Sequence, residues 1–251
     1  MNKKNNIELI LTQVFIILMP LFLIQGHICK YRKPEFCKNF FFDNFWEENG
    51  FIENFQSLLL FLAILLLLKS YLKIKNFNFF KIFLFIKFIA LIYFLGEEIS
   101  WGQHFFKWNS PSLFLELNNQ KETNIHNISN LFDQLPRSLV MLWCMFCPLA
   151  FLLFKKIMNL DLFIIRPTFV LSHISILLFI LIVPDLFVDK LNLHPGHVDQ
   201  FGKDIFEAKF YDLITFNFIR LSELHELIFA FYFFIYSYSL SKIVLVTRKI
   251  Y

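Results

Sequence analysis

Long apolar runs alternate with shorter polar segments along this chain. Six runs stand out, at residues 9–24, 51–72, 79–95, 138–158, 168–188 and 221–246. Most approach the roughly 20 residues that a helix needs to cross about 30 Å of hydrocarbon. Because a chain inside a bilayer must satisfy its own backbone hydrogen bonds, each run is predicted to be helical. The pattern predicts an all-α fold, a polytopic membrane helical bundle with about six transmembrane helices.

Composition supports this class of protein. Of the 251 residues, 57% are hydrophobic, and the mean hydropathy is +0.56. No internal repeat or linker divides the chain, so we expect a single integral membrane domain over residues 1–251. The first run lacks a small-residue cleavage site after Gln25, which predicts an anchor that is not removed. The formal net charge of +4 is small and unevenly placed, which argues against a nucleic-acid partner.

Basic residues favour one end of the predicted bundle. When six helices are threaded, that end carries Lys3, Lys4, Lys69, Lys73, Lys75, Lys81, Lys155, Lys156, Arg166, Lys242, Arg248 and Lys249. The opposite loops are longer and carry fewer basic residues per unit length. Because cytoplasmic loops are enriched in Lys and Arg, both termini are predicted to be cytoplasmic. The membrane is expected to be the plasma membrane of a bacterium.

Carboxyl groups gather at the opposite, outer end. The stretch Gly96-Glu97-Glu98-Ile99-Ser100-Trp101-Gly102-Gln103 directly follows the third apolar run. An ionised group at the bilayer centre costs roughly 2.5 to 3.5 kcal/mol even on insertion scales, so acids at a helix end indicate a function. Arg220, Glu223 and Glu226 share a helical spacing at the start of the last run. These carboxyl groups are predicted to face one cavity between helices.

These residues define a predicted site. We predict Glu97, Glu98, Ser100 and Glu226 as catalytic residues, and Glu53, Trp101, Gln103, Asn124, His126 and Arg220 as substrate-binding residues. Glu98, His126 and His225 are the predicted ligands of a divalent metal. Carboxylates and imidazoles at a half-buried face can bind such an ion or transfer protons. The first hypothesis is therefore an outward-facing, metal-assisted enzyme that acts on a lipid or lipid-linked substrate.

Simpler interpretations of the same residues stay open. Glu223 can serve only as an ion-pair partner of Arg220, since charges inside membranes usually find partners. His194 and His197 flank a Pro-Gly pair, which is typical of an exposed turn as well as of a pair of metal ligands. Trp101 fits the aromatic belt at a membrane surface without any active site.

Three segments resemble a known group of proteins. Glu48 to Glu53, Gly96 to Gln103 and Asn118 to Asn127 are similar to segments of an uncharacterised group of bacterial multi-pass membrane proteins. The Gly-Glu-Glu-Ile-Ser-Trp-Gly-Gln stretch is the most specific of the three. The resemblance implies a helical membrane fold and brings no activity with it.

Two further hypotheses use other features. Cys29 and Cys37 lie in the first outer loop, and Cys144 and Cys147 form a Cys-x-x-Cys pair in the fourth run. This layout resembles the vitamin K epoxide reductase group, which implies a membrane thiol oxidoreductase. The alternative for these residues is a structural disulfide and two small packing residues. The third hypothesis is a non-enzymatic carrier or assembly protein, in which the buried acids are structural or line an ion path.

Overall fold

A computed structural model of the chain describes residues 6–32, 37, 45–46, 50–76, 78–118, 121–125, 128–153, 165–190 and 219–247. Every regular element within these residues is helical. The long helices are α1 (Asn6–Arg32), α3 (Phe51–Lys73), α4 (Phe79–Glu98), α7 (Asn130–Leu153), α9 (Phe169–Lys190) and α11 (Leu221–Thr247). Three short elements follow α4, namely η3 (Ser100–Gly102), α5 (Gln103–Phe106) and α6 (Ser112–Leu117).

The predicted all-α membrane bundle is confirmed. Each of the six apolar runs falls within one long helix as far as the chain is described, except that Thr168 lies just before α9. Four helices carry stretches long and apolar enough to cross a membrane, namely Ile7–Cys29, Phe51–Lys73, Phe79–Glu98 and Leu221–Leu245. The apolar stretches of α7 and α9 are shorter, Leu135–Phe151 and Phe169–Val183. The chain is therefore a multi-pass membrane protein.

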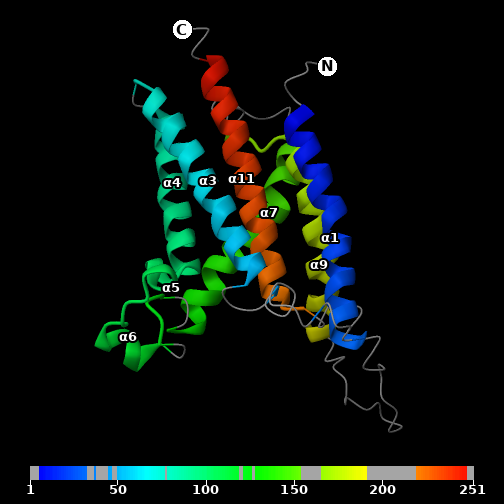
Figure 1. The fold of residues 1–251 in the computed structure, drawn as a ribbon. Coiled ribbons are helices and arrows are strands. Elements are labelled where there is room, and N and C mark those ends of the chain that lie inside the picture. Colours follow the sequence, from blue (N-terminus) through cyan, green and yellow to red (C-terminus); the bar gives the residue numbers. More distant parts are fainter. Residues whose placement is uncertain are drawn as a thin grey trace.

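The long helices run up and down in one bundle with α11 at its centre (Figure 1). Helix α11 packs against α3 on one side and against α7 and α9 on the other, while α4 packs on α3 and α1 on α9. The beginning of α1 and the end of α11 lie at the same end of the bundle, here called the basic end. The short helices α5 and α6 lie at the opposite end, here called the acidic end. Helices α3, α7 and α11 begin at the acidic end, and α4 ends there.

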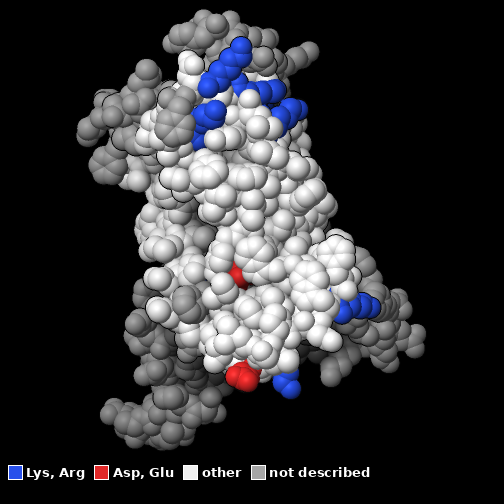
Figure 2. Space-filling view, turned by 90° about the vertical axis from the view of Figure 1, so that its left-hand side faces the viewer, with Lys and Arg blue, Asp and Glu red and all other residues white. Residues whose placement is uncertain are grey.

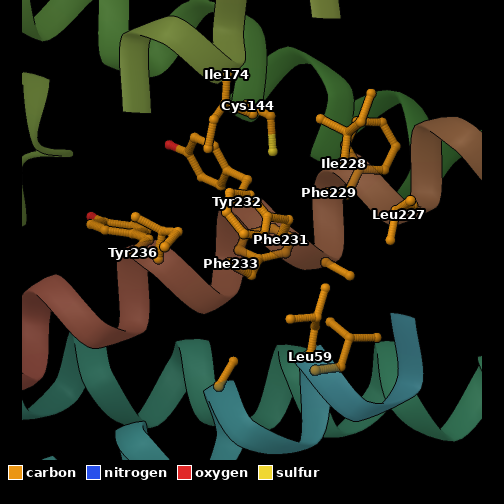
Figure 3. Packing of buried hydrophobic residues seen from close by; sticks show 14 of the residues in the cluster. Leu59, Cys144, Ile174, Leu227, Ile228, Phe229, Phe231, Tyr232, Phe233 and Tyr236 are labelled. Carbon is orange, nitrogen blue, oxygen red and sulfur yellow. The ribbon is translucent and has the colours of Figure 1, made fainter. Parts of the chain in front are cut away.

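Burial explains the central place of α11. In its apolar stretch, 72% of the residues are buried, against 22% in the stretches of α1 and α4. Figure 3 shows Tyr232 of α11 beside Cys144 of α7 and Ile174 of α9, with Leu59 of α3 on the other side of α11. A helix that is apolar all round needs neighbours on every side, whereas α1 and α4 can face lipid.

The outer surface of α3 and α4 fits a bilayer. Exposed apolar side chains cover α4, among them Phe85, Ile86 and Ile89. Figure 2 shows Lys and Arg side chains gathered at the basic end, above a broad surface that is almost free of charge. An apolar belt below a basic rim is the arrangement expected of a helix pair that crosses a membrane.

A few polar contacts tie the helices together inside the apolar bundle. The Ser175 hydroxyl of α9 donates to the Cys144 carbonyl of α7 at 2.6 Å, and the Tyr236 hydroxyl of α11 donates to the Ile165 carbonyl. At the basic end, Lys242 of α11 pairs with Glu8 of α1 at 2.8 Å. Hydrogen bonds between helices can stabilise a membrane bundle in which apolar packing alone favours no particular partner.

Candidate functional site

The predicted site residues that the structure describes all lie at the acidic end, and all but His225 fall into two groups with different surroundings. The first group, here called the loop network, contains Glu97, Ser100, Trp101, Gln103 and Asn124, together with Ser110, Asn118, Glu122 and Thr123. The second group, here called the carboxyl cluster, contains Glu53, Glu98, Glu223 and Glu226, together with Gln56, Arg137 and Arg220.

The chain reverses sharply after α4. Ser100, Trp101 and Gly102 all have positive φ angles, of 45°, 54° and 96°. The reversal folds the Trp101 ring back against Gly96, where an added Cβ would lie 2.9 Å from the ring. Gly96 is therefore needed for close approach of the ring, and Gly102 adopts a conformation that glycine tolerates best. These two glycines explain the spacing of the Gly-Glu-Glu-Ile-Ser-Trp-Gly stretch.

Glu97 joins α4 to the loop that follows α6. One carboxylate oxygen accepts a hydrogen bond from Trp101 Nε1 at 2.8 Å, and the other accepts from the backbone N–H of Ile125 at 2.7 Å. The side chain is only 5% exposed. Both carboxylate oxygens of this predicted catalytic residue therefore accept hydrogen bonds that hold the loop in place.

Ser100 and Asn124 belong to a buried polar contact around Glu122. The Ser100 hydroxyl donates to Glu122 Oε2 at 2.8 Å, and Asn124 Nδ2 donates to the same oxygen at 2.8 Å. Asn118 Nδ2 completes the set by donating to Asn124 Oδ1 at 2.7 Å. Ser100 is fully buried. The hydroxyl of this predicted catalytic residue is therefore held inside the network.

Gln103 has a similar bridging position. Its Nε2 donates to Ser110 Oγ at 2.9 Å, and its Oε1 accepts from the backbone N–H of Thr123 at 2.7 Å. The side-chain amide therefore links the segment before α6 to the segment after it. Trp101 differs from its neighbours because 43% of its surface is exposed.

Glu98 faces the bundle although it is adjacent to Glu97. Consecutive helical residues point about 100° apart, so the two acids of α4 reach different surroundings. The Glu98 carboxyl group lies within electrostatic range of Glu53 on α3, of Glu223 and Glu226 on α11, and of Arg137 on α7. Glu53, Glu223 and Glu226 therefore lie around Glu98, and the roles predicted for these residues stay predictions.

The other acids of the cluster on α11 have fixed partners. Glu226 Oε1 lies 2.5 Å from Arg137 Nη2. Glu223 Oε2 accepts from Gln56 Nε2 at 3.2 Å, and its other oxygen lies 3.5 Å from Arg220. Glu98 makes no hydrogen bond or ion pair with any residue in the described part of the chain. The Glu98 carboxyl group is thus available to bind a ligand or to exchange a proton.

The charges of the cluster do not balance by themselves. Its described members include four carboxyl groups, on Glu53, Glu98, Glu223 and Glu226, and the two guanidinium groups of Arg137 and Arg220. Buried charge without compensation is strongly unfavourable. The remaining carboxyl groups therefore need a proton or a positive charge from outside the described members of the cluster.

Several residues of these groups were not predicted as site residues, among them Arg137, Glu122 and Gln56. Arg137 immediately precedes the fourth apolar run, and Glu122 lies between polar neighbours, so neither has a distinctive local pattern. Gln56 does have a recognisable pattern. It is a polar residue within an apolar run, and it follows Glu53 by three positions, which places both on the same face of a helix.

The predicted metal ligands do not assemble within the described residues. No group of three or more His, Cys, Asp or Glu side chains there is arranged to hold a metal ion. His225 Nε2 is buried without a hydrogen-bond partner in the described structure, and the charged neighbour of this ring is Arg137. His126, like His194 and His197, lies outside the described residues. The metal site therefore stays a prediction that depends on His126.

The two cysteine pairs lie at different depths. Cys29 and Cys37 form a disulfide with a Cα–Cα distance of 5.5 Å, next to the acidic end of α1. Cys144 and Cys147 are free thiols, and Cys144 is fully buried. Cys144 follows Arg137 by seven residues, or about 10 Å of helix. Its packing against the core fits a small apolar residue.

A buried lysine lies deeper in the bundle, eleven residues or about 16 Å along α4 from Glu98. Lys87 is 9% exposed. Its ammonium lies 3.9 Å from the ring centre of Tyr236, 4.9 Å from that of Phe233 and 5.7 Å from that of Trp143. Aromatic faces attract a cation, so these rings compensate part of the cost of its burial.

Comparisons of the chain with protein-family models, curated proteins and solved structures find no match.

Proposed function

We propose that this multi-pass membrane protein is an enzyme that acts on a lipid or lipid-linked substrate at its acidic end. Glu98 is the group that donates or accepts the proton. The observation that carries this proposal is the contrast between Glu98 and its neighbours. Glu223 and Glu226 are held by Gln56, Arg220 and Arg137, whereas Glu98 has no such partner in the described structure.

A general acid or base needs a carboxyl group whose proton is not committed to a structural contact. Glu98 meets that requirement at the end of α4, with charges from α3, α7 and α11 around it. Ionisable residues within membrane proteins commonly mark functional sites, because burying them is costly. Arg137 and Arg220 limit the negative charge at the site by pairing with Glu226 and Glu223.

The loop network acts in this proposal as a support. Glu97, Ser100, Gln103 and Asn124 are positioning residues that hold the chain reversal after Glu98. Trp101 and Trp108 are 43% and 41% exposed at the same end. Indole rings favour the level of the lipid head groups, which is where a lipid-linked substrate presents its polar part.

The acidic end faces the outside of the cell in this proposal, with both termini in the cytoplasm. Lys69, Lys73, Lys75 and Lys81 support this orientation, since they gather around the α3–α4 turn at the basic end. The disulfide between Cys29 and Cys37 supports it independently. Disulfides persist in oxidising compartments and are rare in the cytosol.

Lipid profiling of whole cells tests the proposal. The wild-type protein, Glu98→Gln and Glu116→Gln are expressed at equal levels in a bacterial host, and membrane lipids are compared by mass spectrometry. Glu116 is an exposed acid of α6 outside both groups, which makes it a matched control. Wild type and Glu116→Gln should produce the same new lipid species, and Glu98→Gln should not. An identical lipid change with Glu98→Gln would contradict the proposed role of Glu98.

A further inference from the structure

Two groups of the carboxyl cluster, the Glu98 carboxylate and Gln56 Oε1, have no partner among the described residues, and both are hydrogen-bond acceptors. We propose that the cluster binds a primary ammonium group, so that the substrate is a lipid with an amine-bearing head group. This inference rests on the proposed function, since it names the substrate class of the same site. It is carried by Gln56 Oε1 and by Glu98, neither of which has a partner among the described residues.

Gln56 supplies an observation that is independent of the acids. Its side chain is 1% exposed, and its Nε2 donates both to the Glu223 backbone carbonyl at 2.9 Å and to Glu223 Oε2 at 3.2 Å. Because both of these partners are acceptors, the orientation of the amide is fixed. Gln56 Oε1 is left buried without a hydrogen-bond donor in the described structure. A buried acceptor without a donor is unfavourable, so a ligand that brings N–H groups satisfies it.

The charge of the cluster also selects the ligand. Glu98 makes no hydrogen bond or ion pair with any residue in the described part of the chain. A primary ammonium carries one positive charge and three N–H donors, and it has no acceptor. Glu98 lies within electrostatic range of Glu223, and Gln56 is hydrogen-bonded to Glu223. In this proposal one ammonium group therefore pairs with Glu98 and donates to Gln56 Oε1 as well. A quaternary ammonium carries the same charge but has no N–H group to donate.

The depth of the cluster fits a lipid head group. Glu53 lies in the first turn of α3, Glu223 in the first turn of α11, and Glu98 is the last residue of α4. All three positions are at the ends of apolar stretches that are long enough to cross the bilayer. The polar head-group region begins where such stretches end. An amine carried by a lipid head group therefore reaches the same level as these carboxyl groups.

Two lipids that differ at the amine provide the test. Phosphatidylethanolamine has a primary ammonium and phosphatidylcholine a quaternary one, and both are used with identical acyl chains. Binding of each lipid to the purified full-length protein is measured by native mass spectrometry and competition in nanodiscs. The wild type and Glu116→Gln should prefer phosphatidylethanolamine on the order of tenfold, the effect expected for a hydrogen-bonded charge.

Variants assign the preference to the cluster. Glu98→Gln and Gln56→Leu should each reduce the preference toward equal binding, whereas Glu98→Asp should retain part of it. Glu98→Asp keeps the charge, so it separates loss of the ammonium site from general damage to the fold. If Gln56→Leu fails to fold, the comparison of Glu98→Gln with Glu98→Asp decides the question.

Equal binding of the two lipids by the wild type would overturn this inference. An unchanged preference in Glu98→Gln would do the same, since it would place the ammonium elsewhere. Either result would leave the proposed enzyme intact if lipid conversion still required Glu98. Conversely, a preference that depends on Glu98 without any lipid conversion would support the ammonium site and count against the enzyme.

Discussion

At the residue scale, the adjacent acids Glu97 and Glu98 have contrasting partners. Glu97 holds Trp101 and the backbone of Ile125, and Glu98 faces the acids and arginines of three other helices. A direct consequence is that equivalent substitutions at the two positions should have different effects. One adjacent pair thus combines a structural role with the proposed chemical role.

The packing of Trp101 on Gly96 predicts the effect of a methyl group at this position. Gly96→Ala would place a Cβ 2.9 Å from the Trp101 ring, so the ring or the turn must shift. Overpacking of this kind typically costs about 1 to 3 kcal/mol. The melting temperature of Gly96→Ala in detergent should therefore fall below that of the wild type.

The double variant Gly96→Ala with Trp101→Leu provides the control, because the smaller side chain removes the clash. Its melting temperature should fall by less than the sum of the two single effects, as expected for residues in contact. Strict additivity would mean that the ring and Gly96 are not coupled.

At the scale of single elements, α4 carries both a functional carboxyl group at its end and a buried cation in its middle. Glu98 and Lys87 lie eleven residues apart and therefore on nearly the same helix face. No carboxylate in the described part of the bundle pairs with Lys87, whose ammonium is surrounded by aromatic rings. The helix is thus stabilised near its middle by packing rather than by an ion pair.

Replacing Lys87 by methionine should leave the bundle as stable or make it more stable. The two side chains have similar length, and a buried ion carries a desolvation penalty of several kcal/mol, against about 2 kcal/mol for cation–π contacts. Thermal unfolding in detergent measures the effect, with Lys87→Glu as a variant that should be strongly destabilised. A large loss of stability in Lys87→Met would mean that the ammonium has a stabilising role beyond these contacts.

Helix α7 allows the redox hypothesis to be separated from the proposed function. Cys144 is fully buried among core side chains (Figure 3), and Cys147 is half-buried three residues further along the same helix. If both are packing residues, Cys144→Ala with Cys147→Ala should keep lipid conversion and lose only about 1 to 2 kcal/mol of stability through small cavities. Lipid profiling and thermal unfolding of the double variant measure the two effects. Loss of conversion in a folded double variant would instead favour thiol chemistry.

At the scale of the whole molecule, the distribution of charge predicts how the bundle lies in the membrane. Single cysteines can replace Lys75 near the α3–α4 turn and Lys107 near α5, since both lysines are exposed at opposite ends. The background variant lacks Cys144 and Cys147. A membrane-impermeant maleimide added to intact cells should label position 107 and spare position 75. The reverse result would place the acidic end in the cytoplasm.

The sequence was sufficient to predict the six long helices, because long apolar runs leave few other structures possible in a bilayer. It also grouped Glu53, Glu98 and Glu226 at one end. It did not assign Glu97 and Glu98 to different partners, because the reversal at Ser100 to Gly102 decides which of the two side chains meets the loop. The pairs of Arg137 with Glu226 and of Gln56 with Glu223 join residues far apart in the chain, so no local sequence pattern predicts these contacts.

The measurement that tests the account most directly compares Glu97→Gln and Glu98→Gln in one set of preparations. Lipid conversion and melting temperature are recorded for both variants and for the wild type. Glu98→Gln should keep the melting temperature and lose conversion by about 100-fold or more, the usual contribution of a general acid or base. Glu97→Gln should lower the melting temperature, because an amide cannot accept both hydrogen bonds. Full lipid conversion by Glu98→Gln would contradict the account. Loss of lipid conversion in Glu97→Gln with a wild-type melting temperature would contradict it as well.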